Sequence, residues 1–157
     1  MKMQFLCKSH RSQLEKDESK AIHFWQVGFD TGHYFRDLML WVDAIPHLGC
    51  AFETAEILLS RSMIEHRVAC ELFSKSALLL ASTFSNLGHL NEAEKISWMA
   101  INRLERELEN HPAKSEPVNI HLRDHYQQLE QLLTTDHPAN VEGRANTGTM
   151  EDITLLH

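Results

Sequence analysis

The residues best suited to chemistry in this chain are cysteines and histidines that lie close together in the sequence. Each of the three cysteines has a histidine three or four residues away, and one histidine pair has the same spacing: Cys7 and His10, His47 and Cys50, His66 and Cys70, and His121 and His125. Two such ligands one helical turn apart can share a tetrahedral zinc ion. With 11 histidines in 157 residues, however, such neighbours also arise by chance, and no CxxC or HExxH motif accompanies them. The sequence therefore predicts no metal site and no cofactor, and the pairs support a small metal- or ligand-sensing regulator only as an alternative.

Catalysis requires more than these pairs provide. A cysteine and a histidine on adjacent helical turns lack the orienting third group and the oxyanion donors of an acyl-transfer site. The six glycines are never closer than four residues apart, so no glycine-rich phosphate-binding loop is present. The sequence predicts that the protein is not an enzyme.

The composition narrows the range of partners. The formal charge is −7, and no cluster of lysine and arginine is longer than a pair, so a nucleic-acid backbone would be repelled. No apolar run reaches the ~20 residues needed to cross a bilayer. Three scattered cysteines fit a reducing compartment. We expect a cytoplasmic protein with a protein or peptide partner and without a nucleic-acid or membrane partner.

The central stretch, residues 71–108, predicts a helical hairpin. Apolar residues recur at three- and four-residue steps in both halves, and the first half is apolar on nearly every side. Gly88 has the conformational freedom that a helix C-terminus favours, and Asn91 could cap the next helix with its side chain. Because the connection is only about three residues long, the two helices should pack antiparallel. The small residues Ala93 and Ala100 would let them approach closely.

This hairpin resembles a tetratricopeptide repeat over about a fifth of the chain. The positions that carry the resemblance are Leu80, Ala81, Phe84, Gly88, Ala93 and Ala100. The chain departs from the family pattern at Ala77, Ser97 and Glu105, where the family favours tryptophan, a large apolar residue and proline.

The resemblance implies that the first helix of the hairpin faces a concave, ligand-binding side. The family's ligand-facing positions fall on Lys75, Leu78, Ser82, Ser85 and Asn86. Some family members clamp a terminal carboxylate with asparagine and basic side chains. In this chain mainly Lys75 remains of that set, so we expect a more apolar groove that accepts an extended or helical peptide.

Further helices are expected on both sides of the hairpin. The expected ranges are 12–29 with a capping box at Ser12 and Glu15, 33–45 ending before Pro46, a segment beginning after Gly49, and 118–133. Asp30 to Gly32 and Gly49 are interpreted as breaks, and residues 110–116 as a connection. A further break is expected at Arg61 and Ser62, with one bent helix from 49 to 88 as the alternative.

The predicted fold is all-α, with about six helices stacked as antiparallel hairpins in a tetratricopeptide-like array or bundle. Residues 1–133 would form a single helical domain, and residues 134–157 a polar C-terminal tail that is either flexible or docked. The predicted function is non-catalytic protein or peptide binding, as an adaptor, a chaperone-like protein or a regulatory subunit. A structural homodimer that buries the aromatic face of residues 12–45 is a further alternative.

Overall fold

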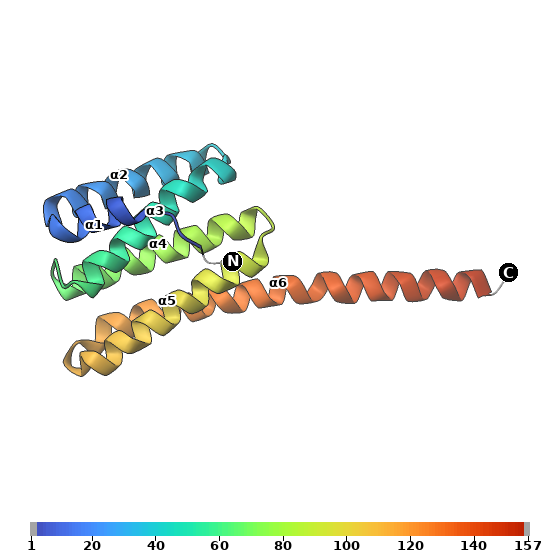
Figure 1. Ribbon diagram of the computed structural model, residues 1–157. Helices are drawn as coiled ribbons and strands as arrows, with labels where there is room; N and C mark the ends of the chain where they lie inside the picture. The colour runs from blue at the N-terminus through green and yellow to red at the C-terminus, as the bar shows by residue number, and fades with distance from the viewer. Residues whose placement is uncertain (1–2, 156–157) are drawn as a thin grey trace.

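The computed structural model describes the backbone of residues 3–155 and the side chains of residues 3–135. Within that part of the chain there are six α-helices, one short 3-10 helix and no strand (Figure 1). The elements are α1 (Lys8–Lys16), α2 (Glu18–Asp37), α3 (Trp41–Ser60), α4 (His66–Asn86), α5 (Leu90–Asn110), η1 (Pro112–Lys114) and α6 (Ser115–Leu155). The predicted all-α fold of about six helices is confirmed.

The long helices pack against their neighbours in sequence as antiparallel hairpins (Figure 1). The first hairpin is α2 with α3, and the second is α4 with α5. Helix α3 joins the two hairpins by packing on α4, while α6 lies against both α5 and α4. Helix α4 therefore packs on three other long helices, is also bound by side chains of α2, and forms the centre of the bundle.

Helix α4 supplies much of the core. Its buried apolar residues include Phe73, Ala77, Leu80 and Ala81, and the Phe73 ring stacks on Phe52 of α3 with the centroids 5.3 Å apart. In the described part of the chain, α4 is the one helix with the length and composition of a membrane span, and 56% of that window is buried inside the bundle. Its apolar character is thus accounted for by its place in the core.

The glycines of the first hairpin do not break helices, so the expected breaks at residues 30–32 and at Gly49 were wrong. Helix α2 continues through Gly32 to Asp37, and α3 passes through Gly49. A Cβ atom at Gly32 would lie 2.5 Å from the Leu48 side chain, and one at Gly28 would lie 3.0 Å from the His47 carbonyl oxygen. These two glycines, one helical turn apart, let the backbones of α2 and α3 approach closely.

The turn of the first hairpin lies at residues 38–40 instead, and Met39 there adopts a φ of 58°. The expected helix end before Pro46 was wrong as well, because α3 begins at Trp41 and includes this proline. Pro46 is exposed and lies in the second turn of α3. Water can therefore hydrate the Val42 carbonyl that lacks its N–H partner.

The N-terminal region also differs from the prediction of one helix over residues 12–29 with a cap at Ser12. Helix α1 begins at Lys8, after Cys7, and the chain breaks at Asp17, whose side chain accepts a hydrogen bond from the Lys20 N–H at 3.1 Å. A short side chain that satisfies a free N–H at a helix start is the usual reason for such a break.

Residues 3–6 precede α1 as an extended segment that packs on α3. The Glu53 carboxylate, 8% exposed, accepts hydrogen bonds from the main-chain N–H groups of Phe5 at 3.0 Å and Leu6 at 2.6 Å. The Phe5 ring occupies the space that a side chain at Gly49 would need. The glycine that was expected to end a helix thus makes room for the N-terminal segment.

The expected break at Arg61 and Ser62 is confirmed, since α3 ends at Ser60 and α4 begins at His66. Its expected cause was wrong, because Glu65 and not Ser62 occupies the N-cap position of α4. Gly88 follows α4 with a φ of +78°, as a glycine at a helix C-terminus does. Asn91 does not cap α5, which begins one residue earlier at Leu90 without a side-chain cap.

Helix α6 begins at Ser115, inside the expected connection at residues 110–116, and its backbone is helical as far as Leu155. Its C-terminal part extends beyond the other helices (Figure 1). The side chains from residue 136 onward lie outside the described residues, so the docking or flexibility of the 134–157 segment stays a prediction.

We predict that Gly32→Ala destabilises the protein. The added methyl group would meet Leu48, which is fully buried, and this overpacking outweighs the higher helix propensity of alanine. The free energy of unfolding should fall by about 1–2 kcal/mol in urea denaturation. The control is His33→Ala at the next position, which is exposed and should change it by less than about 0.5 kcal/mol. An unchanged or higher stability of Gly32→Ala would contradict the close approach of α2 and α3.

Candidate functional site

The predicted partner-binding residues lie on α4, on the side bordered by α2 and α6. Toward α2, the Lys75 ammonium lies 5.4 Å from the centroid of the Trp25 ring and 5.3 Å from that of Phe29. The Ser82 hydroxyl accepts a hydrogen bond from the Arg36 guanidinium at 3.2 Å. Lys75 and Ser82 therefore also hold α2 against α4.

Toward α6, the Leu78 carbonyl accepts a hydrogen bond from the Gln128 side-chain amide at 2.9 Å. Ser82 and Ser85 line a shallow pocket of about 200 Å³ between α4 and α6, here called the serine pocket. Its lining residues are Ser82, Ser85, Gln128, Gln131, Leu132 and Thr135. The structure thus brings Ser82 and Ser85 together, with Leu78 one turn away on the same face, whereas Asn86 is exposed at the end of α4 and does not line the pocket.

Two of the cysteine–histidine pairs do not bring their side chains together. The Cys7 sulfur accepts a hydrogen bond from the main-chain N–H of His10 at 3.5 Å and so caps α1. The His47 ring stacks on Phe35, while the Cys50 sulfur lies 3.8 Å from the Phe5 carbonyl oxygen. These contacts give the two pairs structural roles.

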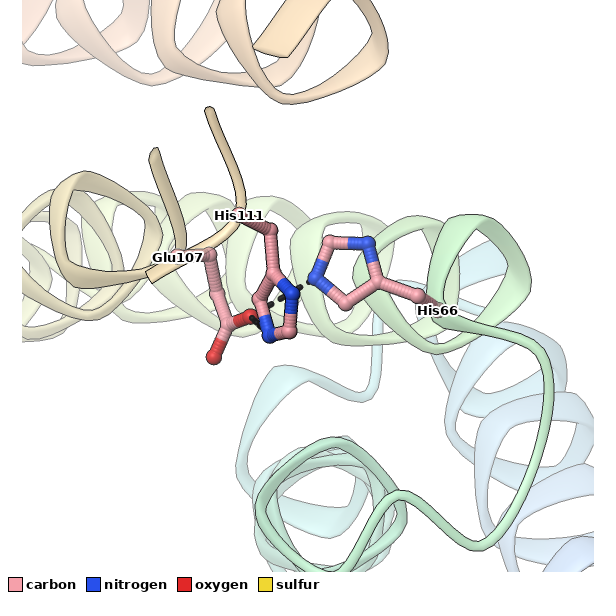
Figure 2. Close-up of side chains that lie close together, drawn as sticks. All are labelled: His66, Glu107 and His111. Carbon is pink, nitrogen blue, oxygen red and sulfur yellow. Dashed lines mark hydrogen bonds and ion pairs between the residues drawn. The ribbon is translucent and has the colours of Figure 1, made fainter. Parts of the chain in front are cut away.

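The third pair lies beside a group that the sequence analysis did not find. His66, Glu107 and His111, here called the His–Glu cluster, lie where α4 begins and α5 ends (Figure 2). The Glu107 Oε2 atom is 2.7 Å from His66 Nε2 and 3.7 Å from His111 Nε2. One ligand atom from each of the three side chains lies within 4.8 Å of the other two.

A signal for this cluster is present in the sequence. In an antiparallel hairpin, residues at equal distances before and after the turn lie side by side. His66 precedes Gly88 by 22 residues, since 88 − 66 = 22, and Glu107 and His111 follow it by 19 and 23. A search for polar residues at matched distances from Gly88 would have placed these three together, whereas the search by local spacing found only Cys70 near His66.

Glu107 is ionised although it is only 4% exposed. Burial alone would raise the pKa of its carboxyl group, but the hydrogen bonds from His66 and Arg103 outweigh this effect, and the pKa is lowered. Arg103 binds the other carboxylate oxygen, Oε1, and also donates a hydrogen bond to the Ser60 hydroxyl at 3.2 Å. The carboxylate is thereby fixed with Oε2 toward the two imidazoles.

Cys70 contributes less to this cluster than its spacing suggests. Its sulfur lies 3.6 Å from His66 Nε2 and 4.0 Å from Nδ1, so it packs against the ring and does not point along one nitrogen. Burial, followed by the charge of Glu107, raises the pKa of the Cys70 thiol to about 11. At neutral pH the group is a protonated thiol, which is a poor nucleophile.

His121 is half-buried, whereas its pair partner His125 lies in the core. His125 is fully buried, and its Nε2 lies 3.1 Å from the Ser74 hydroxyl of α4, while Nδ1 has no hydrogen-bond partner among the described residues. Burial, followed by the charge of nearby His121, lowers the pKa of His125 to about 4. His125 is thus a neutral core residue at the contact of α4 and α6.

Comparison with known proteins found no matching protein family, no matching characterised protein and no matching solved structure. The resemblance to tetratricopeptide repeats therefore stays a prediction, and the function has to be argued from the described side chains.

We predict that His125 makes the protein less stable in mild acid. Its pKa is about 4 in the folded state and about 6.5 in the unfolded chain, so the unfolded state binds the proton more readily. The free energy of unfolding should therefore decrease as the pH falls from about 6.5 to 4, by about 3 kcal/mol in total from this residue. In His125→Gln this contribution disappears, whereas His23→Gln, at an exposed position, should retain it. Identical pH profiles for the His125 variant and the unchanged protein would contradict the assignment.

Proposed function

We propose that this protein is a non-catalytic module that binds a peptide segment of another protein on the α4 face between α2 and α6. The observation that carries the proposal is the serine pocket, where two predicted partner-binding residues, Ser82 and Ser85, lie beside polar side chains of α6. In this proposal the protein acts in the cytoplasm as an adaptor, a chaperone-like protein or a regulatory subunit.

The lining of the serine pocket suits the main chain of an extended peptide. Hydroxyl and amide groups can each donate and accept hydrogen bonds, as the N–H and C=O groups of a peptide require. The Gln128 amide nitrogen binds Leu78 and its Oε1 atom is buried, so Ser85 and Gln131 carry groups that a peptide could reach. The pocket is more polar than the groove expected from the sequence.

The face around the pocket is held rigidly enough to keep one shape. Trp25 of α2 donates a hydrogen bond to Ser76 of α4 at 2.8 Å, and Arg36 donates to Ser82 and Thr83. On the other side, Gln128 of α6 binds Leu78. Because α4 is tied to both neighbours, a peptide that binds here would not have to order the surface first, which lowers the cost of binding.

We predict that Ser85→Glu combined with Gln131→Glu abolishes partner capture. The two carboxylates would replace neutral hydrogen-bonding groups inside the serine pocket and would remain poorly hydrated when a peptide covers them. The measurement is affinity capture from a lysate with quantitative mass spectrometry, followed by binding of the captured partner's purified segment to each variant.

The matched control is Gln127→Glu, an exposed residue of α6 that does not line the pocket. It carries the same substitution on the same helix and should leave both capture and affinity unchanged. Melting temperatures of all variants should agree within a few degrees. If a partner binds the double variant and the control equally well, the serine pocket is not its binding site.

A second candidate function, homodimer formation, is favoured by the tip of the first hairpin. Large apolar side chains are exposed there within nine residues: Tyr34 at 60%, Leu38 at 51%, Met39 at 75%, Leu40 at 44% and Val42 at 69%. By contrast, Trp25 is 3% exposed and packs inside the chain. A self-association surface would therefore lie at this tip and not on the aromatic face of residues 12–45 as a whole.

We predict that, if this tip forms a dimer, Val42→Asp dissociates it. Val42 lies in the first turn of α3, where an acidic side chain is compatible with the helix dipole, so the fold should be retained. Light scattering should report twice the 18.1 kDa chain mass for the unchanged protein and the single mass for the variant. A single mass for the unchanged protein at high concentration would exclude the dimer.

A further inference from the structure

The start of α4 and the end of α5 meet in a group of side chains whose ligand types suit a metal ion. His66 is the first residue of α4, Glu107 lies in the last turn of α5, and His111 follows its last residue. Their nitrogen and oxygen atoms converge on one point in space although 41 residues separate the first two along the chain (Figure 2). From this arrangement we propose that the His–Glu cluster is a binding site for one divalent transition-metal ion of the zinc type.

The distances between the ligand atoms are close to those of a tetrahedral site. Zinc bonds to nitrogen and oxygen are about 2.0–2.1 Å long, which places ligand atoms about 3.3 Å apart around a tetrahedral ion. The two distances to Glu107 Oε2, 2.7 Å from His66 and 3.7 Å from His111, lie on either side of that value. The ligand atoms of the two histidines lie within 4.8 Å of each other, so shifts of up to about 1.5 Å would bring all three atoms to that spacing. His111, whose side chain is 45% exposed, has room to make them.

Residues around the cluster already position the carboxylate ligand. Arg103 binds Glu107 Oε1 and is itself fixed by Ser60 of α3, so Oε2 is left for the ion. Partners of this kind behind the ligands orient them and commonly change metal affinity by about 10–100-fold. Arg103 also offsets the carboxylate charge, so the affinity depends mainly on the two imidazole nitrogens.

The ligand types select the class of ion. Magnesium and calcium prefer six or more oxygen ligands, and this cluster offers a single carboxylate. Two imidazoles with one carboxylate suit zinc and neighbouring divalent transition metals. The Cys70 sulfur packs against the His66 ring, so it is not counted as a ligand. Three protein ligands leave one coordination position for water or for a ligand from solution.

A pocket that is lined in part by His66 lies beside the His–Glu cluster. A pocket of about 450 Å³ is lined by His66 and Cys70 of α4, and by Lys114 of η1 and the first turn of α6. An ion bound to the cluster would connect the beginning of α4 with the segment between α5 and α6. Metal binding would thus stabilise the junction of three helices, far from the serine pocket along α4.

The test is a titration of the metal-free full-length protein with zinc, followed by calorimetry and by competition with a chelating indicator. We expect saturation at one zinc ion per chain in the presence of excess magnesium. At a hundredfold excess of free zinc over Kd, the melting temperature should rise by roughly 5–10 °C. In His111→Asn the affinity should fall at least tenfold, since one of three ligands is lost.

The matched control is His33→Asn. His33 is likewise an exposed histidine four residues from an acidic partner, with its Nδ1 3.6 Å from Asp37 Oδ2, but it has no second histidine beside it. His33→Asn and Cys70→Ser should both keep the affinity of the unchanged protein. Since His111 is exposed, its variant should fold, which circular dichroism without zinc would verify.

Three outcomes would overturn the assignment. They are the absence of saturable zinc binding, an affinity of His111→Asn equal to that of the unchanged protein, and an equal loss of affinity in His33→Asn. The second outcome would place any bound zinc outside the His–Glu cluster. Because the titration uses zinc alone, its result does not depend on the proposed peptide binding.

Discussion

The antiparallel pairing of α4 and α5 is the constraint on which the rest of the molecule depends. The turn between them requires the positive φ of Gly88, a backbone conformation that glycine adopts at little cost. Once the turn is made, the start of α4 must lie beside the end of α5, which assembles the His–Glu cluster. The same pairing covers one side of α4 and leaves its remaining surface to α3, α6 and side chains of α2.

Periodicity in the sequence predicted the helices well where one apolar stripe dominates, as in α5. The central hairpin and the connection between α5 and α6 follow from such patterns and from local turn residues. The break near Arg61 was also predicted, but from a cap at Ser62 that the structure does not form. The errors at Gly32, Gly49 and Pro46 arose because a glycine or proline can either end a helix or lie within one, and only tertiary contacts distinguish the two. The helices continue through Gly32 and Gly49, and the absence of a side chain at these positions makes room for Leu48 and Phe5.

The candidate sites were predictable to different degrees. The face that carries Ser82 and Ser85 followed from a family resemblance, whereas the contribution of Gln128 and Gln131 could not, because it depends on how α6 crosses α4. The His–Glu cluster was missed because local spacing identifies ligands only within one helix. His66 lies on one helix, and Glu107 and His111 lie at the end of another. Both helices must be known to extend that far from Gly88 before these residues can be paired.

The His–Glu cluster and the serine pocket lie far apart along α4, so a ligand at one does not contact the other. His66 and Ser82 are 16 residues from each other, since 82 − 66 = 16, which corresponds to about 24 Å along the helix axis. No side chain spans that distance. A ligand at one surface could influence the other only by moving α4 as a whole, and the helix is held by α2, α3, α5 and α6.

The hydrogen bonds between Glu53 and the main chain of Phe5 and Leu6 restrict the order in which the chain can fold. The contact joins residues 47 and 48 positions apart, so it cannot form on the ribosome until α3 has been synthesised. Hairpins that close short loops form early, and contacts between distant residues form later. Phe5 and Leu6 are therefore attached only after the first hairpin has formed, although they are synthesised before it.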